Sequence, residues 1–352
     1  MDDALAQLIR DAFADNASDV FLLEDDPPRI RKSGQLVTLH PAPIPKAAME
    51  RFWTDCCHTQ PAEHHEADIS WQLPGTGRLR VNLYHTLGRL AAALRPIQST
   101  IPTLEELGMP APLLQSWMRR RGGLILISGA TGAGKSTTVA SCLNWVNHHL
   151  DRHIVTLEDP IEYLFENELS YFSQREIRHD SENFATGLHS ALRQNPDIIF
   201  IGEVRDKDTP VTALRAAETG HLVISTLHSA SAIETLERFS SMLTSGGESA
   251  AALGVLSNQL IGIVSQQLLP RTTGGVIPIL DYFQNEAATR RWILENRIAD
   301  LQDHIDRTPG ETCCSRVNYL VAAARQNLVD PEVARSACPR PQDFDRAMRG
   351  IS

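Results

Sequence analysis

The sequence predicts an α/β protein with two domains, and three observations lead to this class. The chain has 352 residues, which exceeds the usual size of a single domain, ~100 to 200 residues. Residues 1–98 combine helical periodicity with short extended segments. Residues 122–284 contain continuous apolar strands that alternate with helices, a pattern typical of a parallel sheet covered on both faces.

The first domain, residues 1–98, is expected to be a small α+β module. The segment MDDALAQLIRDAFAD has helical periodicity, and the extended residues after it are interrupted by turns at Asp25–Pro28 and Ser33–Gly34. A second helix is expected from about Lys46 to His58. Further strands are expected at Asp68–Leu73, Gly77–His85 and Arg89–Pro96.

Residues 99–121 are expected to link the domains, because three prolines interrupt them and their apolar residues follow neither a helical nor a strand period strongly. Residues 122–284 should form the second domain, and residues 285–352 a helical C-terminal region. From Ala230 onward we expect mostly helix, with one strand at Ile277–Tyr282 and a weakly ordered tail after Arg335. The strands expected before that are Gly123–Ser128, Ile154–Leu157, Ile198–Ile201 and Leu222–Thr226, with helices beginning near Ser136, Phe184 and Thr209.

The composition disfavours two classes of protein, those that bind nucleic acid and those that span a membrane. A net charge of −10 disfavours a protein that binds the phosphates of nucleic acid, because such binding depends on Lys and Arg side chains. No run of about 18 apolar residues suits a membrane span, and the start of the chain has no basic region before an apolar core. We therefore expect a cytoplasmic protein without membrane insertion.

The cysteines do not predict a metal site. The chain has six, without a CxxC motif. The cluster Cys56, Cys57, His58 with Glu63, His64 and His65 matches no zinc spacing. We interpret this cluster instead as the partly buried edge of a helix.

Residues 129–137 fill the pattern GxxxxGK[ST] between an expected strand and an expected helix. Glycines let successive N–H groups point at phosphates, the lysine neutralises them, and the serine hydroxyl is a ligand for Mg²⁺. An ordinary glycine turn would not require Lys followed by Ser. The candidate nucleotide-binding residues are Gly129, Ala130, Thr131, Gly132, Ala133, Gly134, Lys135, Ser136 and Thr137.

Two expected strands end in acids, where ligands of a parallel sheet gather. Glu203 follows Ile198–Ile201 and Gly202, and it is the candidate for holding Mg²⁺ or polarising the attacking water. Glu158, Asp159 and Glu162 follow Ile154–Leu157, on a turn that Pro160 defines. An acid there can act as a general base, whereas a solvated loop is the alternative.

His221 and His228 bracket the strand Leu222–Thr226. His228 follows the end that faces the ligand crevice, so it is placed to sense the γ-phosphate. His221 lies about 20 Å away if the strand is extended, and strand geometry alone does not assign it a role.

Four segments together resemble the secretion ATPases of type II secretion and type IV pili. They are GATGAGKSTT, TLEDPIEY, ALRQNPDIIFIGEVRD and AAETGHLVISTLHS. Within that family the pilus retraction ATPases are the most similar, since ASDVFLLEDDPPRIRKSGQL and QREI also resemble their motifs. Residues 288–295 match the C-terminal motif of the retraction enzymes only in part.

The resemblance implies a PAS-like N-terminal domain and a RecA-like P-loop NTPase domain with a mostly parallel sheet. It implies a homo-oligomer, a hexameric ring with ATP between neighbours, and Mg²⁺ as cofactor. Glu162 falls at the family's catalytic glutamate, Glu203 at the Walker B acid, and His221 and His228 at the box histidines. Arginines that would reach a neighbour's nucleotide are Arg78, Arg80 and Arg95.

The function implied is coupling of ATP hydrolysis to pilus retraction through an inner-membrane platform protein, with the ATPase peripherally associated with that membrane. An accessory role in retraction stays open, as does an ATPase of a type IV secretion or conjugative thin-pilus system. A RecA-like nucleic-acid translocase is less favoured, because the chain is acidic and lacks an aromatic and basic groove.

Overall fold

The computed structural model describes residues 3–32, 34–57, 61, 65–97, 100–204, 208–244 and 249–350. The chain divides into two compact units, one of Met1–Ser99 with Pro160–Leu164 and one of Thr100–Asp159 with Phe165–Ser352. We call them the N-terminal and C-terminal units. The predicted α/β class with a mostly parallel second sheet is confirmed. The finer division into four segments stays a prediction.

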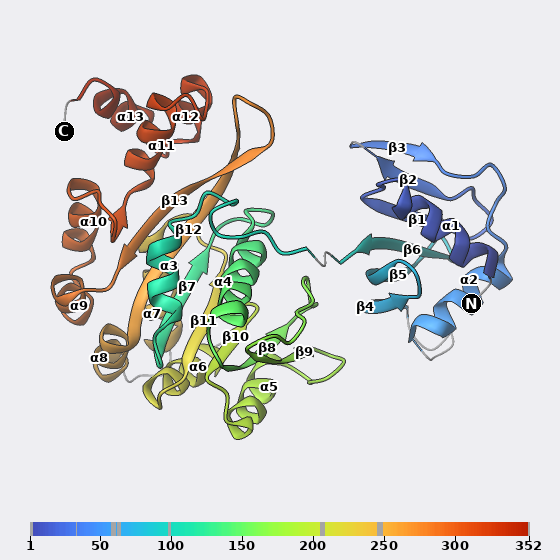
Figure 1. Cartoon of the computed structure of the whole chain (residues 1–352), viewed down its shortest axis with the longest axis horizontal. Helices are drawn as coiled ribbons and strands as arrows, with labels where there is room; N and C mark the ends of the chain where they lie inside the picture. Colours follow the sequence, from blue (N-terminus) through green and yellow to red (C-terminus); the bar gives the residue numbers. More distant parts are fainter. Residues whose placement is uncertain are drawn as a thin grey trace. The chain divides into compact units, whose positions relative to one another are not determined.

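The N-terminal unit is a six-stranded antiparallel sheet with two helices (Figure 1). Its strand order is β3-β2-β1-β6-β5-β4. Alternate strand residues such as Val20 and Val81 pack with Ile9, Phe52 and Trp53 from the helices. Its elements are α1 Asp3–Ala14, β1 Asp19–Leu23, β2 Arg29–Lys32, β3 Gln35–Thr38, α2 Lys46–Cys57, β4 Glu66–Leu73, β5 Gly77–Thr86 and β6 Arg89–Pro96.

The C-terminal unit is built on an eight-stranded sheet in the order β14-β13-β12-β7-β11-β10-β8-β9. The strands from β12 to β9 in this order are parallel, and β13 and β14 are antiparallel additions. The strands are β7 Gly123–Ser128, β8 His153–Glu158, β9 Tyr171–Glu176, β10 Ile198–Ile201, β11 Leu222–Leu227, β12 Leu260–Pro270, β13 Val276–Gln284 and β14 Cys313–Cys314.

Helices cover both faces of this sheet (Figure 1). On β7, Leu124 and Leu126 pack into the core beneath α5 to α8, and Ile125 and Ile127 into the core beneath α3 and α4. Successive side chains of a strand point to opposite faces of the sheet, so alternate residues of β7 belong to different cores. The helices are α3 Ala111–Met118, α4 Lys135–His149, α5 Phe184–Ala191, α6 Asp208–Glu218, α7 Ala232–Thr244, α8 Ser249–Gln259, α9 Ala287–Leu294, α10 Ile298–Arg307, α11 Arg316–Arg325, α12 Pro331–Ala337 and α13 Pro341–Met348.

Two parts of the chain differ from the sequence prediction. The segment Leu260–Pro270 is the strand β12 rather than helix, because a short apolar run does not distinguish the two and this one continues α8 directly. The tail after Arg335, expected to be weakly ordered, instead contains the last residues of α12 and the whole of α13. Phe344 packs with Leu320 and Val321 of α11 in a small core, so contacts distant in sequence order the tail.

Three of the residues named in the sequence prediction, His58, Glu63 and His64, lie outside the described residues, as does Ser33 of the second turn. Among the residues that the structure describes, no helix combines the length and the apolar character that crossing a membrane requires. Over the same residues, no group of three or more His, Cys, Asp or Glu side chains is arranged to hold a metal ion.

The contact between β12 and α3 leaves no room for a side chain at Gly262. A Cβ there would lie 2.4 Å from the ring of Trp117 and 2.7 Å from the carbonyl oxygen of Phe283. We expect Gly262→Ala to lower the free energy of unfolding by about 1–3 kcal/mol through overpacking. Gly254→Ala is the control, because its Cβ would meet nothing nearer than 3.8 Å, at Leu294, and alanine favours a helix. Equal unfolding temperatures for the two variants would contradict this packing.

Candidate functional site

Residues 129–134 connect β7 to α4 at the carboxyl end of the parallel strands, and residues 135–137 form the first turn of α4. Gly129, Gly132 and Gly134 have positive φ angles of 148°, 78° and 86°, which side chains rarely adopt. Gly134 is the N-cap residue, and Lys135 begins the helix. The loop therefore turns back so that the N-terminus of α4, the positive end of the helix dipole, faces the same edge of the sheet.

The side chain of Lys135 folds over this loop. Its Nζ donates to the carbonyl oxygens of Gly129 at 2.8 Å and Ala130 at 3.1 Å. It also lies 3.5 Å from Nδ1 of His228. Because an ammonium group can only donate, Nδ1 of His228 accepts.

His228 joins the loop to the strand β10. Its Nε2 lies 3.2 Å from Oε1 of Glu203, so the ring places one nitrogen toward the Lys135 ammonium and the other toward a carboxylate. The neutral tautomer with the proton on Nε2 satisfies both contacts. The structure thus brings Lys135, His228 and Glu203 together.

Strand register explains this convergence. Ser128 pairs with Leu227, and Ile201 pairs with Ser225, so β7, β11 and β10 end at the same edge. Thr226 donates its hydroxyl to the carbonyl oxygen of Gly202, which ties the segment before Glu203 to β11.

Glu158, at the end of β8, is buried. Its Oε1 accepts a hydrogen bond from Thr156 Oγ1 at 2.6 Å. Glu176 on the neighbouring strand β9 is also buried and pairs with it in register. A Cβ at Gly202 would lie 3.1 Å from the carbonyl oxygen of Leu157, so the glycine allows β10 and β8 to end side by side.

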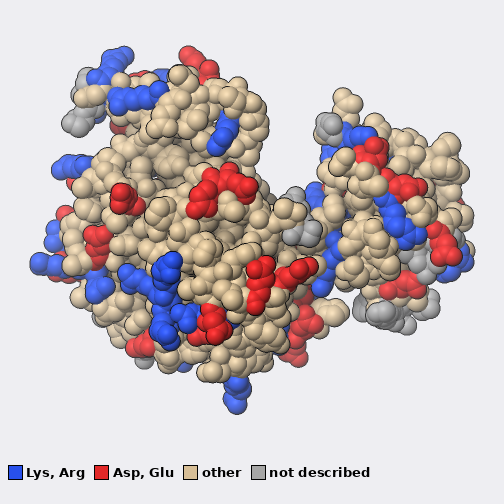
Figure 2. Space-filling model, in the orientation of Figure 1, with Lys and Arg blue, Asp and Glu red and all other residues tan. Residues whose placement is uncertain are grey.

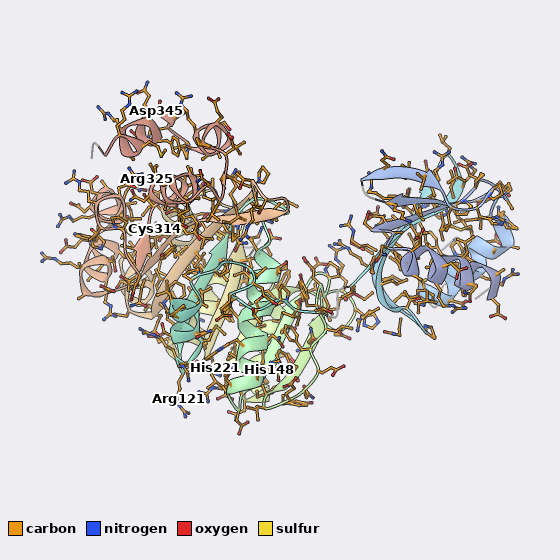
Figure 3. All side chains as sticks on the ribbon, turned by 45° about the horizontal axis from the view of Figure 1, so that its top comes forward. Arg121, His148, His221, Cys314, Arg325 and Asp345 are labelled. Carbon is orange, nitrogen blue, oxygen red and sulfur yellow. The ribbon has the colours of Figure 1, made fainter. Side chains whose placement is uncertain are left out.

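Glu162 and His221 are placed differently from the loop residues. Glu162 follows the end of β8 with an exposed side chain. His221 precedes β11, and its carbonyl oxygen accepts from the N–H of Gly123 at the start of β7. It therefore lies at the edge of the sheet opposite the loop, at the same end as Arg121 (Figure 3). The structure does not bring His221 to the loop, and the roles of both residues stay predictions.

Ser136 and Thr137 stand in the first turn of α4, half-buried. The Ser136 hydroxyl and the Glu203 carboxylate are oxygen ligands that follow β7 and β10, two strands that end at the same edge with β11 between them. Such ligands suit Mg²⁺, which binds one or two protein oxygens and keeps several waters. The donor set thus fits this ion.

Arg78, Arg80 and Arg95 lie on neighbouring strands of the N-terminal unit. Arg80 on β5 is directly opposite Arg95 on β6, an arrangement that repels unless each charge is compensated. Arg80 donates to Asp68 at 2.7 and 3.3 Å, and Arg95 donates twice to one oxygen of Asp19 at 2.7 and 2.9 Å. Arg80 and Arg95 are therefore each neutralised by a separate carboxylate.

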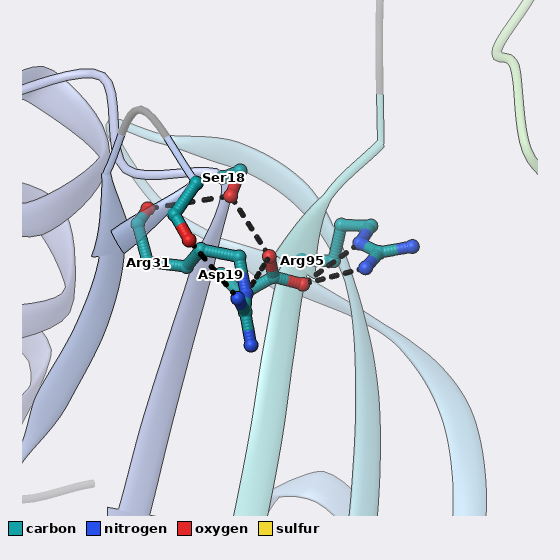
Figure 4. A network of polar contacts seen from close by, with 5 residues as sticks. Ser18, Asp19, Arg31 and Arg95 are labelled. Carbon is teal, nitrogen blue, oxygen red and sulfur yellow. Dashed lines mark hydrogen bonds and ion pairs between the residues drawn. The ribbon is translucent and has the colours of Figure 1, made fainter. Parts of the chain in front are cut away.

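Asp19 is the centre of this network (Figure 4). The carboxylate is mostly buried, whereas Arg95 is 66% exposed. Asp19 also accepts from the Ser18 hydroxyl at 2.8 Å and lies 3.7 Å from Arg31. Asp19 therefore holds the Nε and Nη2 edge of the Arg95 guanidinium, while the arginine side chain as a whole stays largely exposed.

Two sets of contacts at this edge were not predicted from the sequence, one made by Gln266 and the other by Asp281 and Arg316. Gln266 on β12 bonds to the glycine-rich loop, with its Nε2 donating to the carbonyl oxygen of Ala133 at 2.6 Å. Glutamine in a strand carries no motif, and only the sheet order brings it to the loop.

The second set holds the segment after His228. Asp281 on β13 accepts from the N–H of Ala232 at 2.9 Å, and Arg316 at the start of α11 donates to the carbonyl oxygen of Ala230. Burial raises the pKa of Asp281 to about 6, and the Ala232 N–H and Arg316 oppose this rise. Burial also lowers the pKa of Arg316. The C-terminal region thereby fixes the loop that carries His228.

The comparisons with known proteins agree with this geometry. The family described as Type II/IV secretion system protein matches residues 2–295. The chain belongs to this family. It is 34% identical over 345 residues to the type IV pilus retraction ATPase PilT of Pseudomonas aeruginosa strain PAO1, covering 97% of this chain and 99% of that protein.

Two solved structures of ATPases superpose on this chain along most of its length. The crystal structure of the pilus retraction motor PilT with bound ADP superposes with a TM-score of 0.90 at 36% identity, covering 97% of this chain and 98% of that one. The ATPase DotB of Legionella pneumophila superposes with a TM-score of 0.84 at 26% identity, covering 94% of each chain. The secretion ATPase family predicted from the four segments is confirmed.

The raised pKa of Asp281 predicts how stability depends on pH. Because the folded-state value of about 6 lies above the ordinary 3.8, the folded protein holds this proton more tightly. The stabilisation is full below about pH 4 and is lost as pH rises through 6, a change of about 3 kcal/mol. Urea unfolding of the protein and of Asp281→Asn from pH 4 to 7 should show the native protein losing stability relative to the variant. A constant difference between them would contradict the burial of this carboxyl.

Proposed function

We propose that this protein is a P-loop ATPase that couples hydrolysis of Mg·ATP to retraction of a type IV pilus. The observation that supports it most is the convergence of Lys135, His228 and Glu203 at one edge of the sheet. Similarity to PilT along almost the whole chain supports the same function.

In this proposal residues 129–137 bind the nucleotide phosphates. The N–H groups of the loop and the N-terminus of α4 donate to phosphate oxygens. Lys135 moves from the carbonyls of Gly129 and Ala130 to the β- and γ-phosphates. Ser136 and Glu203 hold Mg²⁺, the latter directly or through water. The ion, when bound, neutralises charge on the β- and γ-phosphates.

Departure of Lys135 toward a phosphate changes the surroundings of His228. Its Nδ1 loses the ammonium group as a donor, so the contacts of the ring depend on the nucleotide while Nε2 remains beside Glu203. His228 thus reports the state of the nucleotide to β10 and to α7, whose Arg238 donates to its carbonyl oxygen at 2.7 Å.

The acids have separate roles in the proposal. Glu162 is the general base, because its exposed carboxylate can accept a proton from water. Glu158 is buried and already accepts from Thr156, so it supports the turn instead of taking the proton. Glu203 stays beside the metal ion and His228.

We propose that the working form is a hexameric ring, in which Arg78, Arg80 and Arg95 of one subunit approach the nucleotide of its neighbour. An arginine near a γ-phosphate stabilises charge that develops during transfer. The largely exposed side chain of Arg95 supports this role.

The partner in this proposal is an inner-membrane pilus platform protein, which places the ATPase peripherally at that membrane. A second candidate is the ATPase of a type IV secretion system, favoured by the superposition with DotB. Deletion of the gene separates them: retraction predicts cells with surplus surface pili and no twitching, whereas a secretion ATPase predicts loss of secretion with normal pili.

A nucleic-acid translocase remains the weaker alternative, because the chain carries a net charge of −10. On the face of the C-terminal unit drawn in Figure 2, one group of Lys and Arg side chains borders Asp and Glu, and further acidic side chains lie elsewhere on the same face. Stimulation of ATP turnover by DNA would favour this alternative.

Lys135→Ala should abolish ATP turnover without unfolding the protein, because it removes a charge that serves the phosphates and opens no cavity in the core. Lys32→Ala is the control, since Lys32 is a half-exposed cation paired with Asp15 at 2.7 Å in the N-terminal unit. Phosphate release should be lost in the first variant and kept in the second. Equal rates in both would reject the assignment of the phosphate loop.

The shared site predicts rescue by mixing. Lys135→Ala protein and Arg95→Ala protein should each turn over ATP slowly, and mixed rings should regain activity where an intact loop meets an intact arginine. An arginine supplied in trans changes rates by ~10³ or more in other phosphoryl-transfer enzymes, so a few competent boundaries suffice. Full activity of a monomer, as judged by light scattering under assay conditions, would refute the shared site.

A further inference from the structure

Gln266 lies where β12 meets the glycine-rich loop. The residue before it, Ser265, pairs with Ser128, the last residue of β7. Gln266 is therefore beside the first residue of the loop. A Cβ at Gly129 would lie only 2.3 Å from the backbone oxygen of Gln266, so the two segments are in direct contact.

The side chain of Gln266 reaches the other end of the loop. It is 2% exposed, its Nε2 donates to the carbonyl oxygen of Ala133 at 2.6 Å, and its Oε1 accepts from the hydroxyl of Thr138 at 2.9 Å. A carbonyl oxygen can only accept, so the amide has one orientation and the hydroxyl must donate. Backbone and side chain of one residue thus contact both ends of the loop.

The bond to Ala133 fixes the direction of a neighbouring donor. The carbonyl of Ala133 and the N–H of Gly134 belong to one planar trans peptide, so they point in opposite directions. With the carbonyl held toward β12, the N–H is directed to the other side of the loop. Gly134 has φ 86°, and glycine permits this peptide to rotate at little steric cost. Rotation would turn an oxygen toward the position of a phosphate.

We propose that Gln266 is a positioning residue for nucleotide binding, which holds the Ala133–Gly134 peptide so that its N–H faces the phosphates. This inference rests on the proposed nucleotide site. Part of the affinity for ATP would then come from β12, a strand that carries no recognised motif.

Gln266→Met tests it, because the side chain keeps its length and loses both hydrogen bonds. We expect the Kd for ATP and for ADP, measured with a fluorescent nucleotide analogue, to rise about ten-fold. At saturating ATP kcat should change far less than KM, since the lost interaction serves binding. Gln267→Met is the matched control: Gln267 is the next residue of β12, on its other face, and nucleotide affinity should be unchanged.

Thr138→Val separates the two hydrogen bonds. It removes the donor to Gln266 Oε1 and leaves the bond to Ala133, so it should weaken nucleotide binding much less than Gln266→Met. A loss as large as that of Gln266→Met would overturn the role of the peptide. If Gln266→Met alone does not fold, the double variant with Thr138→Val removes the unpaired hydroxyl and is compared with Thr138→Val alone.

The outcomes distinguish this inference from the function on which it rests. If the wild-type protein binds ATP and Lys135→Ala does not, but folded Gln266→Met binds as well as wild type, Gln266 has no positioning role. If Gln266→Met lowers the unfolding temperature without changing Kd, its role is structural and the inference falls. Absence of nucleotide binding by the wild-type protein would reject the proposed function itself.

Discussion

The arrangement of the candidate site depends on the parallel register of β7 between β11 and β12. Ser128 stands beside Leu227 on one side and Ser265 on the other. A parallel sheet brings carboxyl ends to one edge, so the phosphate loop and His228 leave their strands together, while β12 continues past them and brings Gln266 beside the loop. A slip of one residue would reverse which face each side chain occupies and would separate Lys135 from its partners.

The sequence predicted the parts of the site whose signal is local. A glycine-rich loop between a strand and a helix, and an acid directly after an apolar strand, are recognisable from adjacent residues. Glu203 and His228 could be placed because each follows a strand that ends at the ligand edge. The distance of His221 from that edge also followed from strand length alone.

The residues that were missed depend on order in the sheet. Gln266 lies 128 residues after Thr138, and nothing in the sequence states that β12 is the neighbour of β7. Asp281 and Arg316 likewise act on the His228 loop from a strand and a helix far along the chain. Strand order in a doubly wound sheet is a tertiary property, so its consequences for side chains appear only in the structure.

The aspartates beside the arginines of the N-terminal unit have a further consequence for selectivity among anions. Any anion that approaches Arg95 must compete with Asp19, which is already in place and largely shielded from water. Chloride and free carboxylates bring a single charge and gain little by exchange. A polyphosphate carries several charges, and its oxygens are suited to a guanidinium. In the proposed ring, arginines that are already neutralised by a carboxylate would favour a polyphosphate over small singly charged anions.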